Sequence, residues 1–197
     1  MLPAAFDYVR ADSADAALAA LAQHGDEAKL LAGGHSLIPL MRFRLATPSV
    51  LIDVGQLNGD LRGITVADDE VRIGALTRHS ELEHSTELAE ACPMLAHVAS
   101  LVGDPSVRHR GTLGGSLAHA DPASDLPAAV LALDGTLIAT GPAGQREIAA
   151  TDFFTGFLES ALAPEEMLTE IRVPVSTGGW AYEKLNRRAQ DLSLIHI

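Results

Sequence analysis

Two short glycine-containing segments carry the residue types best suited to binding a ligand. The first reads AGGHS at 32–36, and the second reads RGTLGGS at 110–116. Glycine lets a backbone turn tightly and approach a ligand closely, and free N–H groups at a helix start attract an anion. Both segments also carry hydroxyl side chains. The chemistry they indicate is therefore binding of an anionic ligand through adjacent backbone donors.

The spacing of the glycines excludes two common nucleotide sites. Neither segment matches G-x-G-x-x-G, which is typical of a Rossmann NAD site, or the phosphate-binding G-x-x-x-x-G-K-[ST]. A single glycine pair is most often only a tight turn. Two such segments in one chain better fit a long diphosphate ligand that is held from two sides.

The first segment lies within a predicted strand, loop and helix. A helix is expected from Ser13, a favourable N-cap, to the region of Gly25, a favourable C-cap. A short buried strand at 28–32 then leads into the glycines, a helical turn follows at 36–43, and a second buried strand is expected at 50–54.

The pattern changes after residue 57. Apolar and polar residues alternate over 61–67 and 70–75 around Asp68 and Asp69, which predicts an antiparallel hairpin. Helices are expected at 77–85, 87–91, 94–102 and 126–133, and further strands at 137–140, 147–149, 168–173 and 180–185. The predicted fold class is α+β, with an α/β subdomain over 1–56, a mixed subdomain with an antiparallel sheet over 57–190, and a truncated or atypical tail over 191–197.

The composition of the chain limits which kinds of partner and cofactor it can bind. The 197 residues include 14 Lys and Arg against 26 Asp and Glu, a formal net charge of −12, which disfavours nucleic acid. Cys92 is the only cysteine, so this chain alone cannot hold a disulfide or an iron–sulfur cluster, and we expect Cys92 to be a buried apolar residue. No apolar run of ~20 residues and no signal peptide is present, so we expect a cytoplasmic protein that does not span a membrane.

Two long stretches resemble a known family. AGGHSLIPLMRFRLATPSVLIDV and VRHRGTLGGSLAHADPASDLPAAVLALDGT are similar to the two FAD-binding signatures of the medium subunit of molybdenum hydroxylases, the xanthine dehydrogenase and aerobic carbon monoxide dehydrogenase family. The resemblance covers about residues 1–190. It implies FAD as cofactor and the FAD-binding fold of the vanillyl-alcohol oxidase type, with the flavin between two subdomains. The family continues into a further domain, which implies that a C-terminal domain is missing here.

The resemblance also implies which residues bind FAD. The diphosphate would lie on the first segment, with the second segment on its other side. Asp125 would bond the ribose or ribityl hydroxyls, Leu168 would border the adenine, and Lys184 would lie near the flavin ring. No catalytic residue and no metal ligand is expected. The implied FAD-binding residues are Ala32, Gly33, Gly34, His35, Ser36, Leu37, Leu101, Thr112, Gly115, Ser116, Asp121, Asp125, Leu168 and Lys184.

The implied function is electron transfer within a multisubunit enzyme. Electrons would arrive from an iron–sulfur small subunit, after substrate oxidation in a molybdopterin large subunit, and would leave to an external acceptor. Two alternatives stay open, a stand-alone flavin reductase of the same fold and a non-catalytic nucleotide-binding module. His35 is either a hydrogen-bonding or a covalently attached histidine, and Arg108 and Arg110 either pair with phosphate or are solvated.

Overall fold

The structure, a computed structural model, describes residues 2–57 and 59–185. Its N-terminal part is built on a parallel sheet of strand order β1-β3-β2, with Tyr8 paired to Leu51 and Leu30 to Ile52. The strands are β1 (Asp7–Arg10), β2 (Ala28–Leu31) and β3 (Val50–Asp53). The central strand β3 is buried over its first three residues, as expected for a parallel strand with neighbours on both edges.

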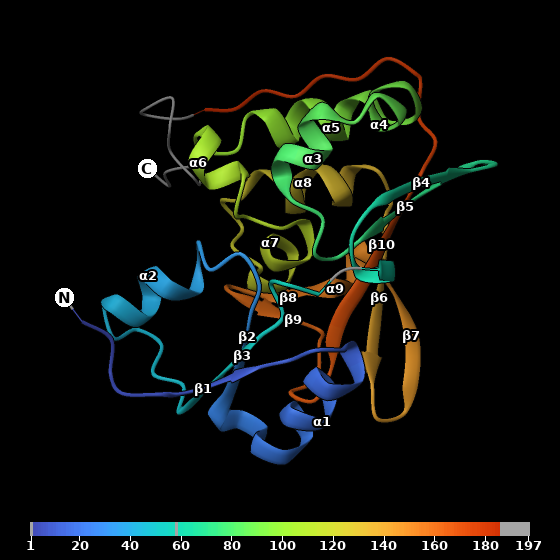
Figure 1. Ribbon diagram of the computed structural model, residues 1–197. Coiled ribbons are helices and arrows are strands. Elements are labelled where there is room, and N and C mark those ends of the chain that lie inside the picture. Colours follow the sequence, from blue (N-terminus) through green and yellow to red (C-terminus); the bar gives the residue numbers. More distant parts are fainter. Residues whose placement is uncertain (1, 58, 186–197) are drawn as a thin grey trace.

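Helix α1 (Ala14–His24) packs against this sheet through Ala17 and Leu21 (Figure 1). The Ser13 hydroxyl accepts a hydrogen bond from the Ala16 N–H at 3.0 Å, and the helix ends at Gly25 with φ of 55°. The predicted capped helix is therefore confirmed. A single 3-10 turn (Gly25–Glu27) connects the helix to β2.

A five-stranded antiparallel sheet forms the second part, in the order β4-β5-β10-β6-β7. The predicted hairpin is its first pair, with Val66 opposite Val71. The strands are β4 (Ile64–Ala67), β5 (Glu70–Gly74), β6 (Thr136–Gly141), β7 (Gly144–Ala149) and β10 (Met167–Pro174), and a separate small pair is β8 (Phe154–Gly156) with β9 (Glu159–Ser160). The antiparallel sheet expected in this part of the chain is confirmed.

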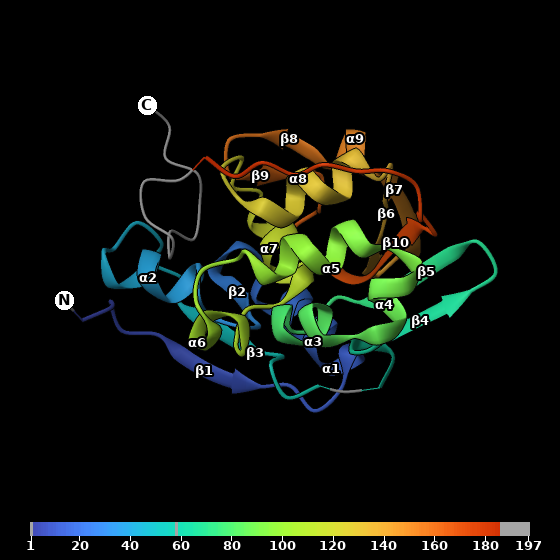
Figure 2. The ribbon, with the colours of Figure 1, turned by 90° about the horizontal axis from the view of Figure 1, so that it is seen from above.

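Helices cover one side of this sheet and share its core, in which Cys92 is fully buried as predicted (Figures 1 and 2). The expected helices are present as α2 (Leu37–Arg42), α3 (His79–His84), α4 (Thr86–Ala91), α5 (Pro93–Ser100) and α8 (Asp125–Ala132). The structure adds the short helices α6 (Pro105–Arg108), α7 (Leu113–His119) and α9 (Ala150–Phe153) and a 3-10 turn (Gly59–Leu61). Among the described residues, none of the helices has the length and apolarity that a bilayer span requires.

The strand predicted at 180–185 is wrong. After β10, residues 175–185, here called the C-terminal segment, run without regular secondary structure along α4, α5 and α8 (Figure 2). The Ser176 N–H donates to the Ala91 carbonyl at 2.8 Å, and the Trp180 ring lies 5.1 Å from that of His97. Tyr182 and Lys184 are half-buried, whereas residues 181, 183 and 185 are exposed. The alternation of buried and exposed side chains, which is typical of a strand, therefore arises here because the segment packs on helices.

The apolar core of the N-terminal sheet extends across the predicted boundary at residue 57. Its buried cluster also includes Leu61, Leu76 and Met167 from the second part. The two parts therefore share packing, and the division into subdomains at 56/57 stays a prediction.

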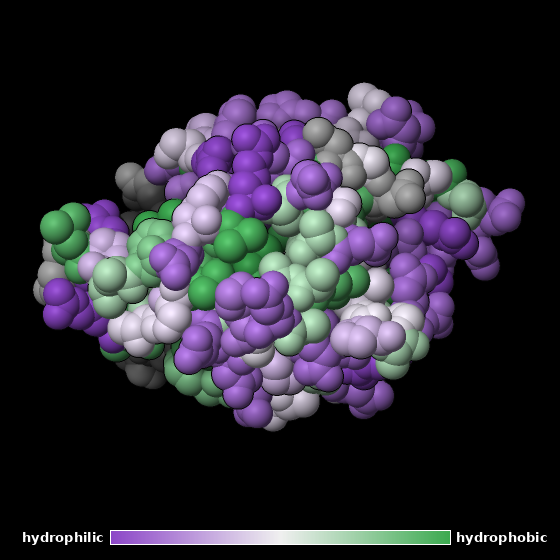
Figure 3. Space-filling view, turned by 60° about the horizontal axis from the view of Figure 1, so that its bottom comes forward, coloured by the Kyte–Doolittle hydropathy of each residue, from purple (hydrophilic) through white to green (hydrophobic). Residues whose placement is uncertain are grey.

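On the face shown in Figure 3, hydrophobic side chains gather at the centre and hydrophilic ones surround them.

Candidate functional site

The two glycine segments meet at one cavity of about 680 Å³. Residues 32–37 form one part of its lining, and residues 111, 112 and 114–116 form another. The remaining lining is largely apolar and comes from many parts of the chain, among them β2, α2, the end of α7 and residues 162–164 and 166–168. This volume lies within the ~300–1,000 Å³ typical of small-molecule sites. The structure therefore brings together the two segments that the sequence places far apart.

Gly33 is the point where the segments touch. A Cβ atom built on Gly33 would lie 2.3 Å from the Arg110 carbonyl oxygen and 2.9 Å from the Gly111 Cα. These are backbone atoms, so any larger residue would force the segments apart. At Gly115, a Cβ atom would lie 2.6 Å from the Thr112 hydroxyl oxygen and 3.9 Å from the Ala32 Cβ.

The second segment uses its backbone donors within the protein. The Leu113 N–H donates to the Thr77 carbonyl at 3.0 Å, and the Gly114 N–H donates to the Ala75 carbonyl at 2.8 Å. The Thr112 side chain and carbonyl accept from the next two N–H groups, because Thr112 is the N-cap of α7. The expectation of free donors at residues 113–116 is therefore wrong, since the chain forms a capped helix there.

The first segment has the opposite character. Over the described part of the chain, the backbone N–H groups of residues 33–37 donate no hydrogen bond to the protein. Gly34 adopts a φ of 79°, in the left-handed region that favours glycine, and so turns the chain from β2 toward α2. The residue before that helix, Ser36, makes no side-chain cap. These successive N–H groups are the donors left for an anionic ligand.

Arg78 braces the second segment, and sequence reasoning did not identify it. Arg78 is 7% exposed, and its guanidinium donates to the carbonyls of Gly55, at 2.9 Å, and of Arg110. Burial and the nearby Arg62 and Arg110 lower the pKa of Arg78. The side chain thus ties the end of the parallel sheet to the start of the second segment. An isolated arginine carries no sequence signal for such a tertiary contact.

His79, the next residue, was also missed. It is 4% exposed and lines the cavity. Burial, followed by the neighbouring His35, Arg78 and Arg108, lowers the pKa of His79 to about 4. Its imidazole is therefore neutral near pH 7.

Three of the predicted site residues form a separate cluster. The Lys184 ammonium donates to a carboxylate oxygen of Asp125 at 2.8 Å and to the Leu101 carbonyl at 2.9 Å. The Tyr182 hydroxyl donates to the other Asp125 oxygen at 2.7 Å, and burial together with Asp125 raises the pKa of Tyr182. Over the described residues, these groups do not line the cavity. Their contact with FAD stays a prediction.

Asp121 and Leu168 do line the cavity, as does His35. One Asp121 carboxylate oxygen accepts the Ala123 N–H at 2.9 Å. Burial and Arg110 lower the pKa of His35. Among the described residues, no group of three or more histidine, cysteine or acidic side chains is arranged to hold a metal ion.

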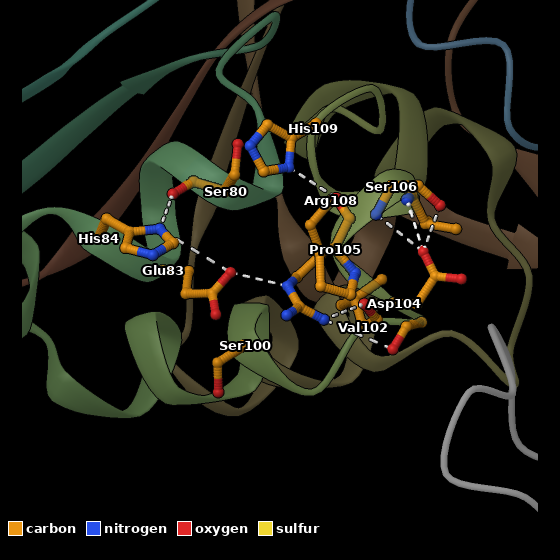
Figure 4. A network of polar contacts seen from close by, with 12 residues as sticks. Ser80, Glu83, His84, Ser100, Val102, Asp104, Pro105, Ser106, Arg108 and His109 are labelled. Carbon is orange, nitrogen blue, oxygen red and sulfur yellow. Dashed lines mark hydrogen bonds and ion pairs between the residues drawn. The ribbon is translucent and has the colours of Figure 1, made fainter.

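Arg108 is engaged elsewhere (Figure 4). Its guanidinium donates to the Glu83 carboxylate at 2.7 Å and to the carbonyls of Val102 and Gly103. This ion pair is partly buried. It holds α6 against α3, and it does not support the phosphate-binding interpretation of Arg108.

The site fits a dinucleotide with a diphosphate bridge. The first segment supplies open N–H donors beside a glycine contact with no space for a Cβ atom, and the apolar lining suits planar rings. FAD has this chemistry.

Comparison with known proteins agrees with this fit. A family described as the FAD binding domain in molybdopterin dehydrogenase matches residues 4–176. The carbon monoxide dehydrogenase medium chain of Afipia carboxidovorans is 45% identical over 193 residues, which are 97% of this chain and 67% of the relative. The 6-hydroxypseudooxynicotine dehydrogenase complex subunit alpha of Paenarthrobacter nicotinovorans is 41% identical over 196 residues, 98% of this chain and 66% of the relative.

Solved structures show the same likeness. A carbon monoxide dehydrogenase structure from Hydrogenophaga pseudoflava matches with a TM-score of 0.94 and 44% identity, over 98% of this chain and 68% of that one. Quinoline 2-oxidoreductase from Pseudomonas putida 86 matches with a TM-score of 0.93 and 34% identity, over 98% and 67%. The chain spans about two thirds of the length of these relatives. From its sequence and its fold, the chain belongs to the family of FAD-binding domains of molybdopterin dehydrogenases.

Proposed function

We propose that this chain is the FAD-binding part of the medium subunit of a multisubunit molybdenum hydroxylase, in which it transfers electrons. The observation that carries the proposal is one cavity lined both by residues 33–37, whose N–H groups donate no hydrogen bond within the described protein, and by a second glycine segment that is fixed in place. Family membership supports the cofactor. The vanillyl-alcohol oxidase type of fold, with the flavin between two subdomains, is part of the same proposal.

The residues of the chain bind and position rather than react. The N–H groups of the first segment hold the diphosphate, and Gly33 fixes its distance from the second segment. Arg78 keeps that second segment in place, while the apolar lining, including Leu168, excludes water from the rings. FAD, when bound, supplies the redox chemistry, accepting and releasing electrons. No side chain of this site has to act as a general acid or base.

The partners follow from the same proposal. Relatives are named as medium chains or as subunits of dehydrogenase complexes. We propose that an iron–sulfur small subunit delivers electrons to this chain, that a molybdopterin large subunit oxidises the substrate, and that an external acceptor receives the electrons. Cys92 is the only cysteine of this sequence, which has too few thiolates to hold an iron–sulfur cluster by itself.

FAD titration tests the cofactor. We expect the purified chain to retain FAD near one equivalent, with flavin absorbance after gel filtration. At a free FAD concentration of about 100 Kd, binding adds ~2.7 kcal/mol to the free energy of unfolding. Absence of both retention and a thermal shift would contradict the proposal. For the partners, the tagged chain should copurify with an iron–sulfur protein and a molybdopterin protein encoded beside it; purification without either argues for a stand-alone role.

A further inference from the structure

The His79 imidazole is held at the junction of the two glycine segments. His79 is the first residue of α3, and its backbone N–H donates to the Gly111 carbonyl at 3.0 Å. A Cβ atom built on Gly111 would lie 2.6 Å from the ring nitrogen Nε2, so the ring packs directly on that glycine. Gly111 in turn lies against Gly33. The ring therefore packs on the glycine that contacts the first segment.

Among the described residues, neither nitrogen of this ring has a hydrogen-bond partner. Within the described residues, Nδ1 of His79 is the only fully enclosed side-chain nitrogen or oxygen without a hydrogen bond. Nε2 is not fully enclosed, and the described residues give it no hydrogen bond either. A buried polar group without a partner is unfavourable, and native proteins keep few of them. Because Nδ1 is enclosed and His79 lines the cavity, a ligand there can reach the ring only through Nε2.

The protonation of the ring follows from its surroundings. Burial and the neighbouring His35, Arg78 and Arg108 disfavour the charged form, so the ring carries a single N–H. A buried N–H without an acceptor is rarer than a buried acceptor without a donor. We therefore place the proton on Nε2 and leave the enclosed Nδ1 as an unpaired acceptor.

We propose that His79 is a further ligand-binding residue, whose Nε2–H donates a hydrogen bond to a diphosphate oxygen of the dinucleotide on the first segment. The proposal rests on the proposed FAD function. Two observations select the diphosphate as acceptor. His79 lies on Gly111, which contacts Gly33, and His79 lines the same cavity as residues 33–37. The neutral donor adds to the backbone N–H groups of residues 33–37.

Two substitutions and one ligand pair test the contact. His79→Leu removes both ring nitrogens, whereas His79→Gln can place an amide N–H near the position of Nε2. Binding of FAD and of riboflavin, which lacks phosphate, is measured by flavin fluorescence. We expect His79→Leu to weaken FAD binding by roughly 10-fold or more, as for a lost hydrogen bond to a charged group. Riboflavin binding should be unchanged, and His79→Gln should stay within about threefold of the wild type.

Two further measurements are independent of flavin binding. Nitrogen NMR of the histidine-labelled wild-type chain should show a protonated Nε2 and an unprotonated Nδ1. Thermal unfolding without FAD should be no lower in His79→Leu than in the wild type, because an unpaired buried nitrogen is removed.

The outcomes separate this proposal from the function on which it rests. If the wild type binds FAD and His79→Leu binds it equally tightly, the contact is refuted and the function stands. Equal losses for FAD and riboflavin, a protonated Nδ1, or a lower unfolding temperature of His79→Leu without FAD would show a structural role instead. If the wild type does not bind FAD, both proposals fail. Should His79→Leu not fold, His79→Gln and the NMR spectrum decide the question.

Discussion

Replacing Gly33 by alanine tests whether the two glycine segments must touch. The new Cβ atom would lie 2.3 Å from the Arg110 carbonyl oxygen and 2.9 Å from the Gly111 Cα, closer than the 3.0 Å that real Cβ atoms keep. Since both obstacles are backbone atoms, the second segment has to move. Overpacking of this kind costs about 1–3 kcal/mol. At this chain length each 1 kcal/mol shifts Tm by roughly 2–4 °C, so we expect a fall of roughly 2–12 °C.

Gly178→Ala is the matched control. Gly178 is exposed, its φ is not positive, and its added Cβ atom would meet nothing within 4 Å. Thermal unfolding without FAD and titration with FAD are measured for both variants and the wild type. We expect Gly33→Ala to lower Tm and to weaken FAD binding by ~10-fold or more, equal to ~1.4 kcal/mol. If Gly33→Ala and Gly178→Ala behave alike in both assays, the contact at Gly33 does not shape the site.

The other predictions concern buried charge. Asp125→Ala removes the carboxylate that pairs with the buried Lys184 ammonium, so it should lower the free energy of unfolding, measured in urea, by about 3–5 kcal/mol. The double variant Asp125→Ala with Lys184→Met should lower the free energy of unfolding less than Asp125→Ala alone. If the losses of the two single variants simply add in the double variant, the pairing is refuted. A lysine at position 78 cannot make both carbonyl contacts of Arg78, so Arg78→Lys should lower the free energy of unfolding by about 1–3 kcal/mol and weaken FAD binding. As a control, Arg72→Lys at an exposed position should change the free energy of unfolding by less than about 1 kcal/mol. Because the unfolded chain protonates His79 near pH 6.5 and the folded chain only near pH 4, stability should fall as the pH drops through this window, by up to about 3 kcal/mol. Denaturation of His79→Gln over the same pH range should show a smaller fall; an identical pH profile would contradict the shifted pKa.

Elements with local signals were predictable from the sequence. The helix between Ser13 and Gly25 has both of its caps in the sequence, and the hairpin around Asp68 has its turn and its alternation. Strand β1 was missed because it is an exposed edge strand, whose pairing to β3 leaves no buried face to read. The C-terminal segment gave the opposite error, since its alternate burial comes from helices and not from a sheet.

The candidate site divides in the same way. The glycine segments were found because glycine at a turn is a local requirement, and their meeting in one cavity follows from the fold. Arg78 and His79 were missed because each acts through contacts with residues more than twenty positions away, at Gly55 or Gly111. Asp125 and Lys184 were assigned by resemblance, yet the structure pairs them with each other. Only their effect on FAD binding can show whether that pair also serves the cofactor.

The two glycine segments look equivalent in sequence and differ in what their backbones can do. The second one is a capped helix start whose N–H groups at residues 113–116 are all engaged, in part by Ala75 and Thr77. In the first segment, the N–H groups of residues 33–37 donate no hydrogen bond to the described part of the protein. An anion therefore has one set of backbone donors to bind, and the second segment serves as the rigid surface that fixes where that set lies. Displacing the second segment should thus reduce FAD affinity without removing any N–H donor. Gly33→Ala and Arg78→Lys are designed to measure this effect.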